Sequence, residues 1–142
     1  MIPEHFQISF RPIADPAAVV RAPGVRFSVL TSRLIRVEYS SADRFEDRPS
    51  QVFWYRDQPV PPFEVERTSD RLSITTEHLR LTYDLTPRGL AQNTLSIEVF
   101  ATQHTWKYGE RDDGQNLRGT ARTLDGVNGS LWLERGLLSR AG

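Results

Sequence analysis

The sequence predicts an all-β protein, an antiparallel β-sandwich with little helix. Three observations predict it. Apolar residues recur with a period of two in several segments, no window of about ten residues has the spacing of an amphipathic helix, and Pro, Gly, Asn and Asp separate the candidate strands. These candidates follow one another at intervals of about 8–14 residues, which is typical of a sandwich or a barrel.

The clearest candidate strands form two hairpins. Residues 25–31 and 33–39 alternate in hydropathy and are separated by a very short link, so we expect them to pair. Residues 71–77 and 78–85 form the second pair. In the latter, apolar residues at every second position alternate with Arg80, Thr82 and Asp84, which predicts a half-buried antiparallel strand. Shorter strand candidates are 5–10, 17–22, 51–55, 63–67, 95–100, 104–108 and 131–133.

Composition excludes several function classes. The 142 residues suit one domain, and 18 basic residues balance 18 acidic ones, so neither nucleic acid nor an anionic membrane surface is an expected partner. The absence of cysteine excludes disulfides, thiolate metal sites and cysteine nucleophiles. We expect no secretory signal and no membrane helix, because the N-terminus lacks a basic leader and no stretch approaches about 20 apolar residues. A cytoplasmic location is compatible with these features.

The three histidines predict no metal site. His5, His78 and His104 are not spaced as ligands on one element, and we expect no cofactor. A sugar epimerase on a β-sandwich would need a histidine and a carboxylate facing one cleft. His78 or His104 with Glu98 or Glu110 could serve, but nothing in the spacing singles them out.

The tryptophans admit two interpretations. Trp54, Trp106 and Trp132 could stack on sugar rings, but large aromatic residues in strands usually belong to the core, and we expect that here. Strand alternation would place Phe53 and Tyr55 opposite Trp54, so at least one of these three should be exposed.

Nothing else in the chain marks an active site. The adjacent acidic residues Asp112 and Asp113 would point to opposite sides of an extended chain, so they cannot flank one glycosidic bond. No phosphate-binding loop and no nucleophile elbow is present in the sequence.

Several ordered motifs nevertheless resemble one family. The chain is similar to the N-terminal β-sandwich domain of glycoside hydrolase family 31, which covers α-glucosidases, α-xylosidases and related enzymes. Upstream, residues 49–56 and 61–65 share the resemblance. The strongest matches are Asn116, Leu117, Gly119 and Thr120, then Arg122, Thr123, Leu124 and Asp125, then Gly136, Leu137, Leu138, Ser139 and Arg140.

The resemblance implies a galactose mutarotase-like supersandwich without chemistry of its own. Members of the family are retaining enzymes whose two catalytic aspartates lie on a (β/α)₈ barrel C-terminal to this domain, and such a barrel takes about 250 residues. We therefore expect residues 1–142 to be a single N-terminal domain cut before the barrel, with no catalytic residue of its own. The implied partners are that barrel and, through it, an α-linked oligosaccharide or glycoside.

Within this chain, the loop 116–126 is the expected sugar contact. Arg122 offers hydrogen-bond donors and Asp125 an acceptor for sugar hydroxyls, and Trp106 is a third candidate. The alternative is that an Arg122–Asp125 pair only holds the loop together.

Two residues depart from the family pattern. Arg118 stands where a glycine is usual, and Ala141 stands where an acidic residue is common. If position 118 has a positive φ, arginine should cost about 1 kcal/mol there. We also expect four leucines of the C-terminal segment to be partly buried against the barrel or the sandwich. They are Leu131, Leu133, Leu137 and Leu138.

Two other functions stay open. An independent carbohydrate-binding module would present exposed aromatic residues on one flat face and would bind sugar without turnover. A small mutarotase-like epimerase would interconvert anomers, although that fold normally needs a longer chain.

Overall fold

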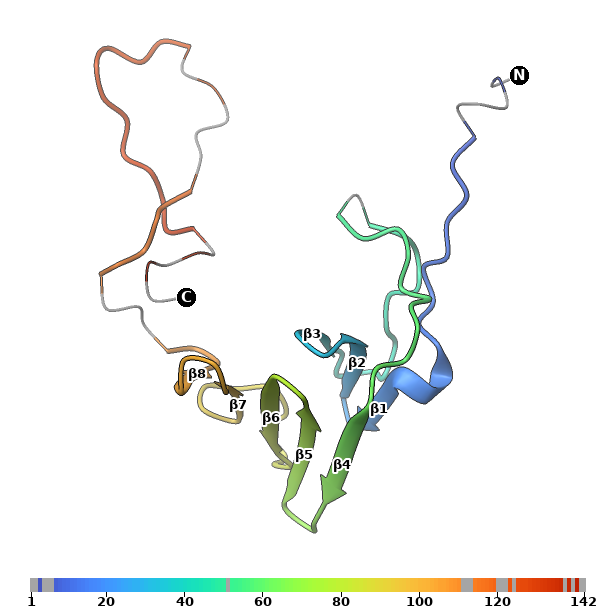
Figure 1. Cartoon of the computed structure of the whole chain (residues 1–142). Helices are drawn as coiled ribbons and strands as arrows, with labels where there is room; N and C mark the ends of the chain where they lie inside the picture. Colours follow the sequence, from blue (N-terminus) through green and yellow to red (C-terminus); the bar gives the residue numbers. More distant parts are fainter. Residues whose placement is uncertain are drawn as a thin grey trace. The chain divides into compact units, whose positions relative to one another are not determined.

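The computed structural model describes residues 3, 7–50, 52–110, 114–119, 123, 125–136, 138 and 140. The chain divides into two compact units, Met1–Gly109 and Glu110–Gly142. The first unit contains all the strands, and the second is an irregular segment in its described residues (Figure 1).

The first sheet has three antiparallel strands in the order β1-β2-β3. They are β1 (Val19–Ala22), β2 (Val25–Thr31) and β3 (Leu34–Tyr39). The short 3₁₀ helix η2 (Pro16–Ala18) precedes β1, and the Asp15 side chain caps its N-terminus. Asp15 caps the turn, and Pro16 is favoured at its first position. The candidate 17–22 therefore begins as a helical turn and becomes a strand only at Val19. The predicted hairpin of β2 and β3 is confirmed.

The second sheet has five antiparallel strands in sequence order, β4 to β8. Its hairpin β5–β6 is the second predicted hairpin, and the candidates 63–67, 95–100 and 104–108 are confirmed within a residue at their ends. The strands are β4 (Phe63–Arg67), β5 (Arg71–Thr76), β6 (Leu79–Asp84), β7 (Leu95–Val99) and β8 (His104–Lys107).

The two sheets enclose one core, which confirms the predicted β-sandwich (Figure 1). Buried and more exposed residues alternate along β5 and β6, as expected for strands with one face inward. The rings of Phe27 and Tyr83 meet edge to face across the sheets, with centroids 5.6 Å apart. The buried cluster consists of Ala22, Val25, Phe27, Val29, Leu72, Ile74, Leu81, Tyr83 and Leu95.

Hydrogen bonds also tie one sheet to the other. The Thr76 hydroxyl donates to the Ser32 carbonyl at 2.7 Å, which joins the turn after β5 to the turn after β2. At another edge, the Arg67 guanidinium donates to the Arg21 carbonyl of β1. The sandwich is therefore fixed by polar contacts at its margins as well as by its core.

Strand β2 is buried on both faces, unlike β6. Its inward residues Phe27 and Val29 join the core, and its outward residues Arg26 and Ser28 are only 6% and 3% exposed. The outward face is covered because polar groups from the connection between β3 and β4 bond to Arg26.

Three other strand candidates are not strands in the described residues. Residues 7–10 of the candidate 5–10 belong to no strand, and 131–133 are irregular. In 52–55, only Tyr55 forms an isolated bridge, to Arg11. Alternation alone does not supply a neighbouring strand, so these segments lack the ladder that a strand requires.

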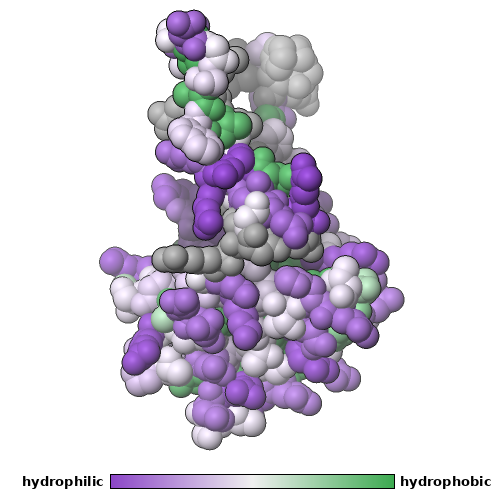
Figure 2. Space-filling view, turned by 90° about the vertical axis from the view of Figure 1, so that its left-hand side faces the viewer, coloured by the Kyte–Doolittle hydropathy of each residue, from purple (hydrophilic) through white to green (hydrophobic). Residues whose placement is uncertain are grey.

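Hydrophilic residues cover most of the described surface on the face seen in Figure 2, and apolar residues appear there only in small groups. Among the residues that the structure describes, no helix has the length and apolar character needed to cross a lipid bilayer.

Candidate functional site

The structure pairs the two motifs that carry most of the resemblance. Residues 115–119 lie beside residues 134–136, 138 and 140 in the second unit, and the two segments run in opposite directions. Three backbone hydrogen bonds join them: Leu117 N to Leu138 O (2.9 Å), Gly119 N to Glu134 O (2.7 Å) and Arg140 N to Gln115 O (3.1 Å). We call this paired arrangement the clasp. It closes the loop that contains the expected sugar contacts.

The side chain of Asn116 forms the centre of the clasp. Its amide nitrogen Nδ2 donates to the Gly136 carbonyl at 2.9 Å, and its oxygen Oδ1 accepts from the Gly136 N–H at 2.8 Å. The same oxygen accepts from Arg118 N at 2.9 Å. A Cβ at position 136 would lie 2.3 Å from the Arg118 carbonyl oxygen, so only glycine fits.

Arg118 has the backbone conformation that the family's glycine would favour. Its φ is +66°, in the left-handed region that costs a residue with a Cβ about 1 kcal/mol. Its guanidinium lies 5.5 Å from the centroid of the Trp132 ring, a cation–π contact that offsets part of this cost.

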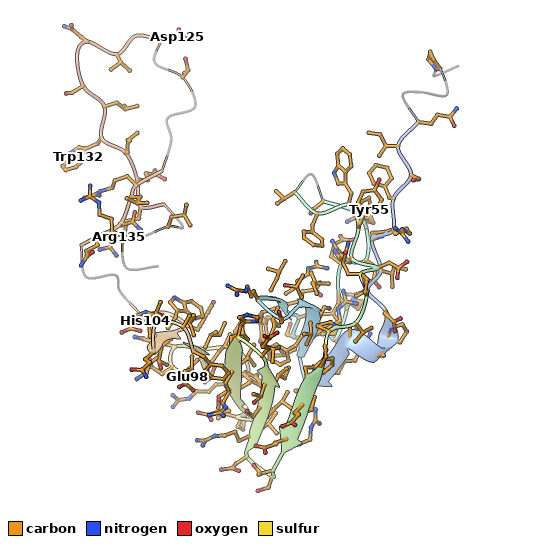
Figure 3. The ribbon with its side chains drawn as sticks, in the orientation of Figure 1. Tyr55, Glu98, His104, Asp125, Trp132 and Arg135 are labelled. Carbon is orange, nitrogen blue, oxygen red and sulfur yellow. The ribbon has the colours of Figure 1, made fainter. Side chains whose placement is uncertain are left out.

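Two of the three predicted sugar-contact residues, Asp125 and Trp106, are among the described residues, and they belong to different units. Asp125 is exposed in a turn, where its N–H donates to the Thr123 hydroxyl at 3.0 Å (Figure 3). Arg122 lies outside the described residues, so the Arg122–Asp125 pair stays a prediction. Trp106 belongs to the first unit, on β8.

Trp106 lies at the margin of the core-facing side of the larger sheet. It pairs with Ile97, which pairs with the buried Leu81, so these three residues share one face. Trp106 is 42% exposed and meets the neighbouring Tyr108 ring edge to face at 6.3 Å. The margin of the sheet at β8 therefore carries an aromatic pair that the core does not cover.

The expectation that the tryptophans belong to the core is wrong. Trp54, Trp106 and Trp132 are 37%, 42% and 87% exposed. Trp54 lies in a loop and Trp132 in an irregular segment, and the Trp132 side chain projects from the chain in Figure 3. Tyr55 is 39% exposed. This confirms the expectation that at least one of the three aromatic residues at 53–55 is exposed.

Glu98 and His104, two of the residues considered for an epimerase, do not face each other. Glu98 lies on the outer face of the sheet, where its carboxylate is 3.6 Å from the Arg80 guanidinium. His104 lies opposite Val99 in the strand register, so its side chain is on the other face of the sheet (Figure 3). The His78 ring nitrogen Nδ1 lies 3.0 Å from the Ser32 hydroxyl. Among the described residues, no group of three or more His, Asp or Glu side chains is arranged to hold a metal ion.

Sequence reasoning missed a cluster of buried arginines on the outward face of β2 and β3. Arg26 makes a two-point ion pair with Glu38, with Nε to Oε2 at 2.7 Å and Nη2 to Oε1 at 3.0 Å. Arg36 reaches the same carboxylate at 2.8 Å. The third member, Arg56, comes from the connection between β3 and β4 and is only 3% exposed. The available signal was that Arg26 and Arg36 fall on the outward positions of their strands.

The three arginines share a single backbone oxygen. The Glu46 carbonyl accepts from Arg26 at 3.2 Å, from Arg36 at 3.3 Å and from Arg56 at 2.9 Å. The hydrogen bond to Glu38 raises the pKa of Arg26. Burial lowers the pKa of Arg36, and the positive charges of Arg56 and Arg26 act in the same direction, while Glu38 opposes them.

Comparison with known proteins adds no identification. No family model matches the chain, and no curated protein matches its sequence.

Proposed function

We propose that this chain is a non-catalytic N-terminal β-sandwich domain of a retaining α-glycoside hydrolase resembling family 31. In this role the sandwich supports a catalytic barrel elsewhere in the enzyme, and the loop held by the clasp contributes to the sugar pocket. The catalytic carboxylates belong to the barrel, so the chain by itself hydrolyses nothing.

The clasp is the observation that carries this proposal. The motifs at 116–120 and 136–140 were matched to the family from the sequence alone. Their residues Asn116 and Gly136 depend on each other through two hydrogen bonds and through a contact that excludes a Cβ. The two motifs, far apart in the sequence, therefore form one local structure in this chain.

Exposed apolar side chains of the second unit support a partner surface. Leu117, Leu131 and Leu138 are 51%, 45% and 70% exposed, and Trp132 is exposed further still. Burying such side chains is favourable at about 25 cal/mol per Å² of apolar area. This fits a segment that packs against another part of a larger enzyme. Of the four leucines expected to be partly buried, Leu133 is half-buried, Leu131 and Leu138 are exposed, and Leu137 lies outside the described residues.

The aromatic pair on β8 favours a second candidate, an independent carbohydrate-binding module. Sugar rings stack on exposed aromatic faces, and Trp106 and Tyr108 are both accessible at the margin of the sheet.

Titration of the purified chain separates the two functions. Tryptophan fluorescence is followed while maltose or xylo-oligosaccharide is added, and release of nitrophenol from nitrophenyl α-glucoside is measured in parallel. The domain function predicts neither saturable binding nor turnover. Saturable binding that Trp106→Ala abolishes and Trp132→Ala leaves intact would establish the module instead, and turnover would overturn both.

A further inference from the structure

The buried arginines and the exposed Arg21 line a solvent-open pocket in the first unit. Its volume is about 240 Å³, room for roughly eight water molecules at about 30 Å³ each. Arg21, Arg26, Arg36 and Arg56 all line it, together with one carboxylate, that of Asp47, and its remaining wall is mainly apolar. We call this the arginine pocket. Glu38, which is paired with Arg26, is a second carboxylate close to the pocket. The four guanidinium groups therefore still outnumber the two carboxylates, Asp47 and Glu38.

The donors around the arginine pocket outnumber their acceptors. A carbonyl oxygen has two lone pairs, yet the Glu46 carbonyl serves three guanidinium groups, and its contacts with Arg36 are long, at 3.3 and 3.4 Å. Arg56 uses one terminal nitrogen for this carbonyl and the other for the Arg48 carbonyl at 2.9 Å.

Arg56 also has a donor with no hydrogen-bond partner among the described residues. Its Nε is buried, and a buried donor left unpaired costs free energy that an acceptor would recover. The residue as a whole is only 3% exposed. The guanidinium fork matches the two oxygens of a carboxylate or a phosphate group.

The geometry points to an oxyanion-binding site in the arginine pocket. A carboxylate or phosphate group binds between Arg36 and Arg56, and Glu38 holds Arg26 in place behind them. The site is independent of the proposed glycosidase role, because it lies wholly in the first unit and uses none of the clasp residues.

Titration with two anions tests the site on the intact chain. The ¹H–¹⁵N signals of the arginine Nε groups are followed while sodium phosphate or sodium acetate is added, with sodium chloride at matched ionic strength as the control. The expected result is a saturable shift of the Arg56 signal with phosphate, acetate or both, and none with chloride. The anion that binds more tightly identifies the source as a free phosphate or as the carboxylate of an organic acid.

Three variants locate the effect. Arg36→Gln should weaken binding about tenfold, since it removes a charge-assisted donor. Arg33→Gln, which removes an exposed charge at the β2–β3 turn, should leave the dissociation constant within about twofold. Arg21→Gln removes a lining charge that meets the connection through a cation–π contact with Phe45, so it tests the pocket even if Arg36→Gln does not fold. Non-saturable shifts, or equal binding by Arg21→Gln and Arg33→Gln, would overturn the proposal.

Discussion

Asn116 and Gly136 are 20 residues apart in the sequence and are joined by two hydrogen bonds, one in each direction. An amide side chain that both donates to and accepts from the same peptide unit imitates the pairing of two strands. It allows an irregular segment to hold its shape without a sheet. The neighbouring backbone bonds from Leu117 to Leu138 and from Gly119 to Glu134 extend the same pairing.

Replacing Gly136 should open the clasp. In Gly136→Ala the new Cβ would lie 2.3 Å from the Arg118 carbonyl oxygen, and overpacking of this kind costs about 1–3 kcal/mol. We expect the hydrogen exchange of the Leu117 amide to accelerate by at least about tenfold. Gly119→Ala is the matched control, because its Cβ would make an ordinary 3.5 Å contact with the Glu134 carbonyl oxygen. Equal exchange rates in the two variants would contradict the described geometry.

The left-handed conformation at position 118 predicts an order of stability. Arg118→Gly and Arg118→Ala both lose the cation–π contact with Trp132, but only alanine keeps the cost of φ at +66°. The glycine variant should therefore be more stable by about 1 kcal/mol. Chemical denaturation that follows the Trp132 environment measures the difference, and equal stability would argue against this backbone conformation.

The contact between Phe27 and Tyr83 should couple the two sheets energetically. Tyr83→Ala should destabilise the first unit by about 3–5 kcal/mol, since the ring is fully buried. A double-mutant cycle with Phe27→Leu and Tyr83→Leu isolates the edge-to-face term, which we expect to be about 0.5–1.5 kcal/mol. If the losses of unfolding free energy in the two single variants simply added in the double variant, the rings would not be in contact across the sandwich.

Glu46 should titrate at unusually low pH. The hydrogen bonds from Arg48 lower the pKa of Glu46 from 4.5 to about 2. Because the folded-state pKa is the lower one, the stabilisation is present above pH 4.5 and is lost as the pH falls towards 2. A ¹³C titration of the carboxyl carbon checks the value. Arg48→Gln should return the pKa towards 4.5, and a Glu46 pKa unchanged by that substitution would assign the shift to another cause.

The sequence was sufficient to predict the fold where strands are half-buried. In β5 and β6 the alternation of Leu81 and Tyr83 with Arg80 and Thr82 directly reflects one inward and one outward face. Alternation was insufficient for residues 52–55 and 131–133, because strand formation also requires a hydrogen-bonding neighbour, and that is a property of the tertiary structure.

The candidate site was predictable only in part. The two motifs of the clasp could be recognised in the sequence, but their pairing could not, because it depends on the Asn116 side chain meeting a peptide unit far along the chain. The arginine pocket was missed for a different reason. Arg26 and Arg36 look like ordinary outward residues of exposed strands, and only the fold of the loop that carries Arg56 buries them.

The central claim is that this chain serves as a non-catalytic domain of an α-glycosidase. The most direct measurement is the length and activity of the polypeptide made from the intact gene, isolated with an antibody raised against this chain. The account predicts a product longer than the present 142 residues by at least a barrel of about 250 residues, which hydrolyses an α-glucoside or α-xyloside with retention of configuration. A product of only 142 residues that hydrolyses neither substrate would contradict it.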